Sequence, residues 1–205
     1  MHERHLIIKI QKGMKKILVL LFFSGSFFIS YGQSLKDLFL NMPQQLCPSL
    51  SEYNRLEIVD NQKNGKPMQT RNLFKTISEM KALTNQYAHL VISQNSEKEM
   101  MLLTKNDSTQ IIMIISTILS DSIADSSVSF YTTDWQPIQA SDHIDEPTSD
   151  DFRKISINPS TLRLTITTSN PLVLQIDGSN KPAKKSAETH QTFVWNLEQN
   201  KFILQ

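Results

Sequence analysis

The densest group of side chains able to bind a metal lies in one acidic stretch of the sequence. Its members are Asp142, His143, Asp145, Glu146, Asp150 and Asp151. Carboxylate oxygens are the ligands that a hard cation such as Ca²⁺ prefers. The spacing fits no calcium loop, because the run lacks a glycine for the sharp turn and Pro147 interrupts it. We therefore interpret this stretch as an acidic surface loop and assign no metal site, with cation binding as the alternative.

Side chains for catalysis are scattered along the chain. His89, His143 and His190 are too far apart in sequence to form a ligand pair on one element. His89 falls in an expected strand, where a hydrogen-bonded and partly buried imidazole is the ordinary outcome. No nucleophile elbow, zinc helix, phosphate loop or dinucleotide glycine pattern occurs. We assign no catalytic residue and no cofactor, and an uncharacterised hydrolase built from distant residues remains an alternative.

One aromatic stretch contains the candidate binding residues. Strand alternation places Phe130 on one face of an expected strand and Tyr131 on the other. Trp135 follows Asp134 at the strand end, where an exposed indole stacks on a sugar or a peptide. Tyr131, Asp134 and Trp135 are therefore candidates for ligand or partner contact. The structural alternative is that Trp135 caps the core beneath the acidic loop.

Two short helices are expected before the strands. Ser34 is placed as an N-cap for a helix that Pro43 ends. A second helix is expected after Pro48 and before Asn64-Gly65, although its Leu56 to Val59 part is also compatible with a strand. The apolar face expected for this second helix consists of Leu50, Tyr53, Leu56 and Val59. Cys47 is the sole cysteine, and we expect a buried core thiol there.

After Lys66-Pro67, alternating β-branched and aromatic residues predict a series of antiparallel strands. The expected strands are 72–77 with a continuation near 80–83, 87–93, 99–104, 110–119, 127–133, 162–168, 172–176, 192–197 and 201–204. Turn residues at 106–108 and 198–200 predict hairpins, and segments 139–151 and 177–190 are expected to be surface loops. The run Ile111 to Ile115 predicts a central strand covered on both faces. The predicted class is α+β, with short N-terminal helices packed on a curved antiparallel β-sheet meander.

The beginning of the chain has the composition of a secretory signal. Lys15 and Lys16 precede the apolar run Ile17 to Ile29, and small residues follow before Gln33. We expect residues 1–32 to be a signal peptide with an upstream extension, translation to start at Met14, and 33–205 to be one mature domain. The alternative is an uncleaved anchor, but the run is short for a membrane span. A cut before Gln33 leaves no cysteine for lipoprotein acylation.

The expected mature chain is mildly acidic. Cleavage removes five of the 21 basic residues and one of the 20 acidic residues, which leaves a net charge of −3. Such a balance argues against a nucleic-acid partner and gives no general attraction to anionic lipid.

A series of short sequence words indicates a known family. They are Leu38-Phe39-Leu40-Asn41-Met42-Pro43, Asn54-Arg55-Leu56, Ser78-Glu79-Met80, Leu83-Thr84, Glu99-Met100-Met101-Leu102-Leu103, Asp107-Ser108-Thr109-Gln110 and Phe130-Tyr131-Thr132-Thr133-Asp134-Trp135. From Leu35 to about Ile138 the chain resembles the uncharacterised exported Bacteroidetes proteins of domain-of-unknown-function family 3256, and the resemblance thins after Gln139. It implies cell-envelope placement and no known activity. It also implies candidate O-glycosylation at Ser108 and Ser122.

We expect an exported protein of the periplasm or cell envelope, with an extracellular location as the alternative, that binds without catalysis. The first hypothesis is an interaction module that docks another exported or envelope protein through a sheet edge or the loop Gln139 to Asp151. The second is a periplasmic carrier of a small glycan or lipid in the concave face of the sheet. No nucleic-acid partner, cofactor or stable transmembrane segment after cleavage is expected.

Overall fold

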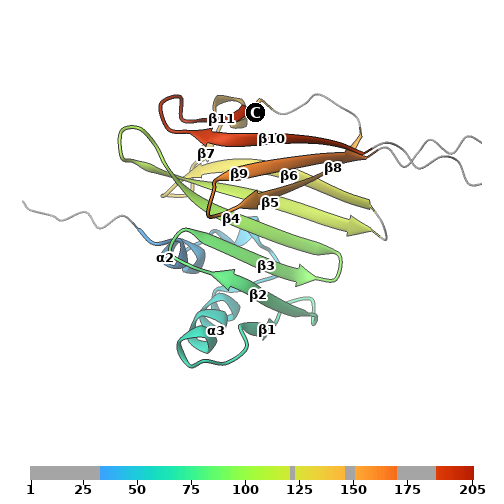
Figure 1. Ribbon diagram of the computed structural model, residues 1–205. Helices are drawn as coiled ribbons and strands as arrows, with labels where there is room; N and C mark the ends of the chain where they lie inside the picture. The colour runs from blue at the N-terminus through green and yellow to red at the C-terminus, as the bar shows by residue number, and fades with distance from the viewer. Residues whose placement is uncertain (1–32, 121–122, 146–150, 170–187) are drawn as a thin grey trace, which may run out of the picture. The chain divides into compact units, whose positions relative to one another are not determined.

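The computed structural model describes residues 33–120, 123–145, 151–169 and 188–205 (Figure 1). From Gln33 onward these residues belong to one compact unit. They form mostly antiparallel β-sheet with few helices, and all statements below concern this described part of the chain.

Two α-helices and a short 3₁₀ helix precede the strands. They are α2 (Leu35–Leu40), η1 (Gln44–Leu46) and α3 (Glu52–Lys63). The Oγ of Ser34 accepts the Asp37 N–H over 3.2 Å, as expected for the predicted N-cap. Ser51 and Asn54 form a reciprocal capping box at the start of α3. Both helices therefore begin at a residue whose side chain satisfies an otherwise unpaired backbone N–H.

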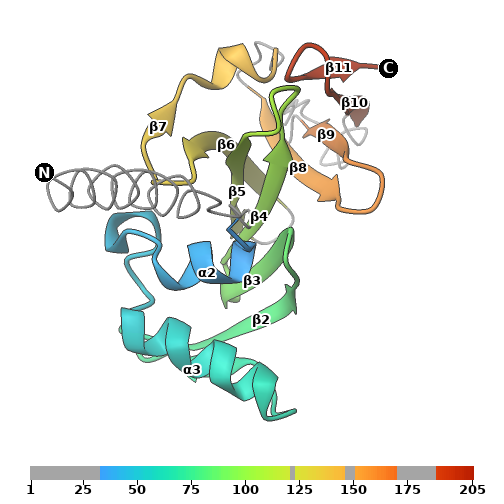
Figure 2. The same cartoon turned by 90° about the vertical axis from the view of Figure 1, so that its left-hand side faces the viewer.

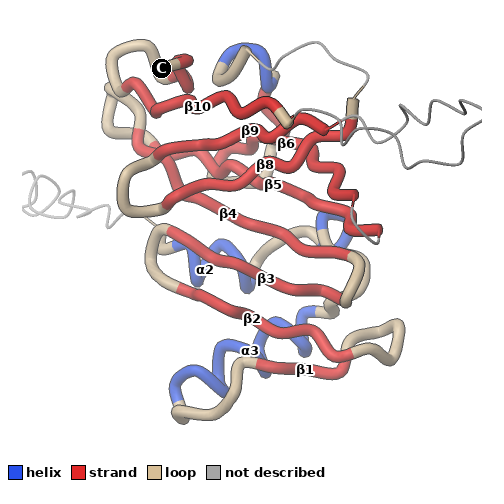
Figure 3. The backbone as a smooth tube through the Cα atoms, turned by 45° about the vertical axis from the view of Figure 1, so that its right-hand side comes forward, coloured by secondary structure: helices blue, strands red, loops and turns tan. Residues whose placement is uncertain are grey.

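The strands form two antiparallel sheets whose strand order follows the chain (Figures 1 and 3). Sheet A contains β1 (Gln69–Arg71), β2 (Ile77–Leu83), β3 (Tyr87–Ser93), β4 (Ser96–Thr104), β5 (Gln110–Ser120), β6 (Ile123–Thr132) and β7 (Pro137–Ile138). Sheet B contains β8 (Phe152–Asn158), β9 (Arg163–Ser169), β10 (Thr189–Asn196) and β11 (Lys201–Leu204), in the order β11-β10-β9-β8.

Strand β5 separates two hydrophobic clusters. All residues of the run Ile111 to Ile115 are buried, which confirms the prediction that both faces of this strand are covered. Ile112 and Ile114 belong to a cluster that also contains residues of α2, α3, β3 and β4. Met113 and Ile115 belong to a second cluster shared with sheet B. Figure 2 shows α2 and α3 near β2 and β3, away from β8 to β10.

Side chains form hydrogen bonds with outward-facing backbone groups of two edge strands. The Ile155 N–H of edge strand β8 donates to Ser126 Oγ of sheet A over 3.0 Å, and this hydroxyl also lies 2.9 Å from Thr117 Oγ1. On edge strand β1, the carbonyl groups of residues 69 and 71 accept hydrogen bonds from Asn61 and Asn54 of α3. Both edges are therefore covered by other parts of the chain, which prevents uncontrolled strand pairing.

Several sequence predictions about the elements were wrong. The strands form two sheets rather than one, and β8 was not predicted. Residues 72–76 form a loop between β1 and β2 instead of a strand. Of the apolar face predicted for the second helix, Leu50 and Val59 are buried as expected, but Tyr53 and Leu56 are exposed. Arg55 and Ile58 of α3 are buried instead. The predicted strand 172–176 lies outside the described residues.

The segment expected to be an acidic surface loop is partly buried. It contains a short 3₁₀ helix, η2 (Ala140–Asp142), and an isolated parallel bridge between Ile144 and Phe202. His143 and Ile144 are buried, because their side chains complete the cluster between the sheets. The second expected loop lies largely outside the described residues, and His190 at its end is in β10.

Candidate functional site

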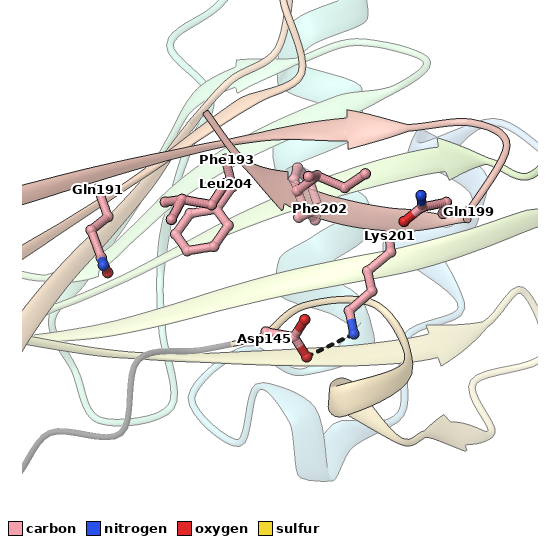
Figure 4. A pocket seen from close by; sticks show the side chains of 8 residues that line it. Asp145, Gln191, Phe193, Gln199, Lys201, Phe202 and Leu204 are labelled. Carbon is pink, nitrogen blue, oxygen red and sulfur yellow. Dashed lines mark hydrogen bonds and ion pairs between the residues drawn. The ribbon is translucent and has the colours of Figure 1, made fainter.

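A pocket of about 450 Å³ opens beside β10 and β11 at the edge of sheet B (Figure 4). Its lining consists of Asp145, Gln191, Phe193, Gln199, Lys201, Phe202, Ile203 and Leu204. This volume lies within the range typical of small-molecule sites. The pocket combines an apolar floor with polar side chains at its rim.

Strand register explains the apolar floor. Phe193 pairs with Leu204 across the β10–β11 ladder, and residue 195 pairs with Phe202. Paired side chains of an antiparallel ladder lie on the same face, so these residues point together toward the interior between the sheets. Phe193 and Phe202 are buried in the second cluster, whereas Leu204 is 54% exposed at the open end. Leu204 is therefore the apolar side chain that an incoming molecule meets first.

An ion pair marks the rim of the pocket. Lys201 Nζ lies 2.7 Å from Asp145 Oδ1, and Figure 4 shows the lysine side chain directed toward this carboxylate. The aspartate side chain is mostly exposed, so we expect this pair to contribute little to stability. Gln191 lies on the same strand face as Phe193, two residues away. The rim thus offers the amides of Gln191 and Gln199 and one charged pair as polar contacts.

The outer edge of β11 borders the pocket. The Gln205 N–H donates to the Thr192 carbonyl over 2.9 Å, and the Phe202 N–H donates to the His143 carbonyl over 2.7 Å. Because interstrand bonds alternate along an antiparallel ladder, the backbone groups of Leu204 point away from β10. Within the described residues they have no hydrogen-bond partner. In the described part of the chain, the Leu204 N–H and carbonyl therefore remain without a partner next to the pocket.

His143 holds this region in place. Its Nδ1 lies 2.7 Å from the Asn200 carbonyl in the turn between β10 and β11. Its ring packs between Phe130 and Trp195, with centroid distances of 5.1 and 6.1 Å. Trp195 Nε1 in turn donates to the Thr104 carbonyl over 3.0 Å. We interpret this histidine as a structural residue that fixes the β10–β11 turn against the core.

A separate polar cluster lies on β3 and β4. Tyr87 Oη donates to Glu99 Oε2 over 2.6 Å, and His89 Nε2 lies 3.1 Å from Glu97 Oε2. Burial raises the pKa of Glu99, against the opposing effect of hydrogen bonds from Tyr87 and from the Ile157 backbone. Burial also raises the pKa of Tyr87. None of these four side chains lines the pocket, and each has a partner that accounts for its position.

The candidate contact residues from the sequence do not converge on the pocket. Tyr131 and Trp135 are half-buried against the first cluster, with ring centroids 6.0 Å apart, and Asp134 is exposed. Trp135 adopts a left-handed backbone with φ of 63°, and its buried Nε1 has no hydrogen-bond partner among the described residues. Packing against the core agrees with the structural alternative for Trp135, although its cluster is the one beside the helices rather than beneath the acidic loop.

The other candidate sites are also apart from the pocket. Ser108 is exposed, with φ of 65°, in the predicted turn between β4 and β5, whereas Ser122 lies outside the described residues. No group of three or more metal-ligating side chains occurs in the described ranges. Of the acidic stretch, Glu146 and Asp150 lie outside those ranges. Cys47 is buried in the first cluster, as predicted.

Comparison with known proteins places the chain in a family. The model of the family described as "Protein of unknown function (DUF3256)" matches residues 28–170. The chain belongs to this family. The match extends beyond residue 139, where the resemblance was expected to thin. Comparison with curated proteins returned no match. Family membership therefore brings no known catalytic role or specific function.

A solved structure shares the fold of this family member. It is the "Structure of a domain of an uncharacterized protein from Porphyromonas gingivalis W83", with a TM-score of 0.67 and 18% sequence identity. The similarity covers 85% of this chain and 98% of that chain. At this level of identity the likeness concerns the fold alone. Among the described residues, no helix is long and apolar enough to cross a membrane.

Sequence reasoning did not find the pocket and did not single out the edge of β11. The hypothesis of docking through a sheet edge or the segment Gln139 to Asp151 is consistent with a pocket that lies between β11 and Asp145. The apolar floor was missed because Phe193 and Phe202 read as ordinary core residues of a hairpin. Their alternation with polar neighbours predicts a buried face but does not say where that face remains open.

Proposed function

We propose that this protein is an exported, non-catalytic interaction module of the cell envelope. In this proposal residues 1–32 act as a signal peptide that is removed before Gln33. The compact unit that begins at Gln33 supports it, together with the apolar run that follows Lys15 and Lys16. The pocket beside β11 is the binding site.

The bound molecule is an extended segment of another exported protein. One observation carries this proposal: the backbone groups of Leu204, which have no hydrogen-bond partner among the described residues, lie beside a pocket with an apolar floor. A peptide that adds to a strand edge gains main-chain hydrogen bonds, and pockets that receive its side chains provide specificity. We propose that the segment pairs with β11 at Leu204 and places an apolar side chain against Phe193 and Phe202.

The proposal also includes the architecture that the sequence predicts for sheet A. We infer short N-terminal helices packed on a curved antiparallel meander. The cluster shared by Leu35 and Leu38 of α2 with Leu90 and Met100 of the sheet supports this arrangement. Such packing leaves the opposite face of sheet A to sheet B, whose outer strand β11 then borders the pocket.

A small-ligand carrier is the second candidate function. The observation in its favour is the pocket volume, which is large enough for a small glycan or lipid fragment. Its aromatic floor would contact an apolar ligand face, and Gln191 would supply a hydrogen bond. In this case the ligand would bind to isolated protein without any partner chain.

Capture experiments distinguish these candidates. Tagged protein is crosslinked in native cells, and the captured proteins are identified by mass spectrometry. We expect Leu204→Lys to remove a reproducible exported partner, because a charge would enter the mouth of the pocket. The matched control is Leu197→Lys, since Leu197 is similarly exposed in the same hairpin but does not line the pocket. Monomeric recovery without a partner would favour the carrier.

A further inference from the structure

A second exposed apolar surface lies on α3 and the β1–β2 hairpin. Eight large apolar side chains are exposed among the described residues, and five of them lie in this region. They are Tyr53, Leu56, Leu73, Phe74 and Ile77. Single exposed apolar residues are ordinary, but Leu73 and Phe74 are adjacent in one loop, and two neighbouring exposed apolar side chains indicate a contact site. None of the five lines the pocket beside β11.

The loop between β1 and β2 presents the most exposed pair. Leu73 is 56% exposed and Phe74 is 69% exposed. The Leu73 N–H donates to the Ser49 carbonyl over 2.9 Å, which places this loop beside the start of α3. Figure 3 shows the loop, in tan, at the ends of β1 and β2. The two side chains are therefore displayed at the tip of a hairpin.

A polar network fixes the loop in this conformation. The Nδ2 of buried Asn72 donates to Thr76 Oγ1 over 2.7 Å and to Ser78 Oγ over 2.9 Å. Its Oδ1 accepts the N–H groups of Phe74 and Thr76. The Asn72 side chain therefore holds the loop in one conformation before anything binds. Leu73 and Phe74 can then make contact without the loss of entropy that ordering a flexible loop would require.

Basic side chains flank the apolar pair. Arg71 and Lys75 are exposed, and residues 71–78 contain no acidic residue. Beyond them, Glu79 is paired with Lys81 over 2.7 Å. The neighbouring helix α3 carries three acidic residues, of which Glu57 accepts a hydrogen bond from Thr70 of β1 and Asp60 is paired with Lys63, while Glu52 lies in the first turn. The tip thus carries two positive charges, although the expected mature chain has a net negative charge. Physiological salt screens the more distant charges, so the charges of the tip itself determine its attraction to a nearby surface.

Strand addition is blocked at this edge. Asn61 and Asn54 of α3 donate to the β1 carbonyl groups of Gln69 and Arg71, so a partner strand finds these acceptors occupied. What remains available is a protruding apolar tip with cations beside it. This combination matches an anionic lipid surface, where apolar side chains enter the acyl boundary and cations remain among the headgroups.

We propose that the β1–β2 tip, through Leu73 and Phe74 with Arg71 and Lys75, inserts into the surface of an anionic membrane. The binding is weak and reversible, because two apolar side chains and two cations provide less than a stable lipid anchor. It orients the domain so that sheet B and its pocket, which pack against β4, β5 and β6 rather than against β1 and β2, remain available to a partner.

Vesicle sedimentation tests this proposal on the compact unit Gln33–Gln205. The vesicles contain phosphatidylcholine alone or equal amounts of phosphatidylcholine and phosphatidylglycerol. We expect the unchanged chain to sediment with the anionic vesicles and binding to fall as salt rises. Leu73→Ser with Phe74→Ser should lower the partition coefficient at least tenfold. Arg71→Gln and Lys75→Gln should each lower it about fivefold.

Ile118→Ser is the matched control, because Ile118 is equally exposed but lies on β5, far along the sheet from β1. Its binding should equal that of the unchanged chain, and all variants should retain the same thermal unfolding curve. The proposal is overturned if the unchanged chain ignores both vesicle types, or if the Leu73→Ser, Phe74→Ser variant binds as well as the unchanged chain. If the unchanged chain binds no vesicles but captures a protein that the Leu73→Ser, Phe74→Ser variant does not capture, the partner of this loop is a protein and the lipid proposal is wrong.

Discussion

Tyr87 Oη lies 2.6 Å from Glu99 Oε2, and this hydrogen bond holds a carboxyl group at the border between the two sheets. The Ile157 backbone of edge strand β8 also bonds to this carboxyl group. Burial nevertheless raises the pKa of Glu99, so the folded state favours the protonated form more than the unfolded state does. The contribution of Glu99 to stability is therefore largest at acidic pH and decreases as pH rises through its folded-state pKa.

Glu99→Gln should remove this pH dependence. A neutral amide carries no charge to bury, and its single oxygen can still accept the Tyr87 hydrogen bond. The free energy of unfolding of the variant, relative to that of the unchanged chain, should therefore rise as the pH increases from about 4, the range of a free glutamate carboxyl group, through the higher folded-state pKa. Urea unfolding at several pH values measures this difference. A difference that stays constant over this range would contradict the assignment of a raised pKa to Glu99.

Ile114→Asp should leave the protein insoluble or unfolded. Ile114 is buried in β5 within the first cluster, where a carboxylate would have no partner. Ile118→Asp is the matched control, because Ile118 lies on the same strand and face but is 67% exposed. The yield of soluble protein and its unfolding temperature provide the measurement. A soluble Ile114→Asp protein with unchanged unfolding would show that β5 is not central.

Asn72→Ala should destabilise the domain by about 2 kcal/mol, since its buried side chain bonds to both ends of the β1–β2 loop. Asn95→Ala provides the comparison, because Asn95 is exposed in another hairpin turn. This control should change the free energy of unfolding by less than about 0.5 kcal/mol. Urea denaturation of both variants tests the prediction, and equal effects would argue against a special role for Asn72.

Ser126→Ala should weaken the contact between the two sheets. The variant leaves the buried Ile155 N–H without its acceptor, at a cost of about 1–3 kcal/mol. Amide hydrogen exchange at Ile155 should accelerate, whereas exchange in β3 should follow only the global stability. Unchanged protection at Ile155 would mean that another group satisfies this edge of β8.

The sequence predicted local features well where one physical signal dominated. Ser34 lies before an apolar run and forms the expected N-cap. The uninterrupted run Ile111 to Ile115 indicated a strand covered on both faces, and both faces are buried. Turn residues at 106–108 and 198–200 lie between paired strands, as predicted. In each case the information is contained within a few neighbouring residues.

Features that depend on distant contacts were not predictable in the same way. The buried face of α3 includes Arg55, whose guanidinium donates to the Leu40 and Leu50 carbonyls, so a polar residue occupies a position that periodicity assigns to solvent. Tyr53, by contrast, is exposed although periodicity assigns its position to the apolar face. The division into two sheets also depends on long-range packing, since alternating strands fit either arrangement equally well. The pocket could not be located because Asp145 meets Lys201 only in the folded chain.

The most direct test of the proposed function is a photo-crosslinking amino acid placed at Leu204 of the protein in its native cells, with placement at Leu197 as the control. Mass spectrometry would identify each crosslinked protein and the peptide that carries the link. We predict one exported partner, linked at Leu204 through an extended segment with an apolar side chain, and no such product at Leu197. Identical products at the two positions, or none at Leu204, would contradict the claim that this edge and its pocket bind a partner.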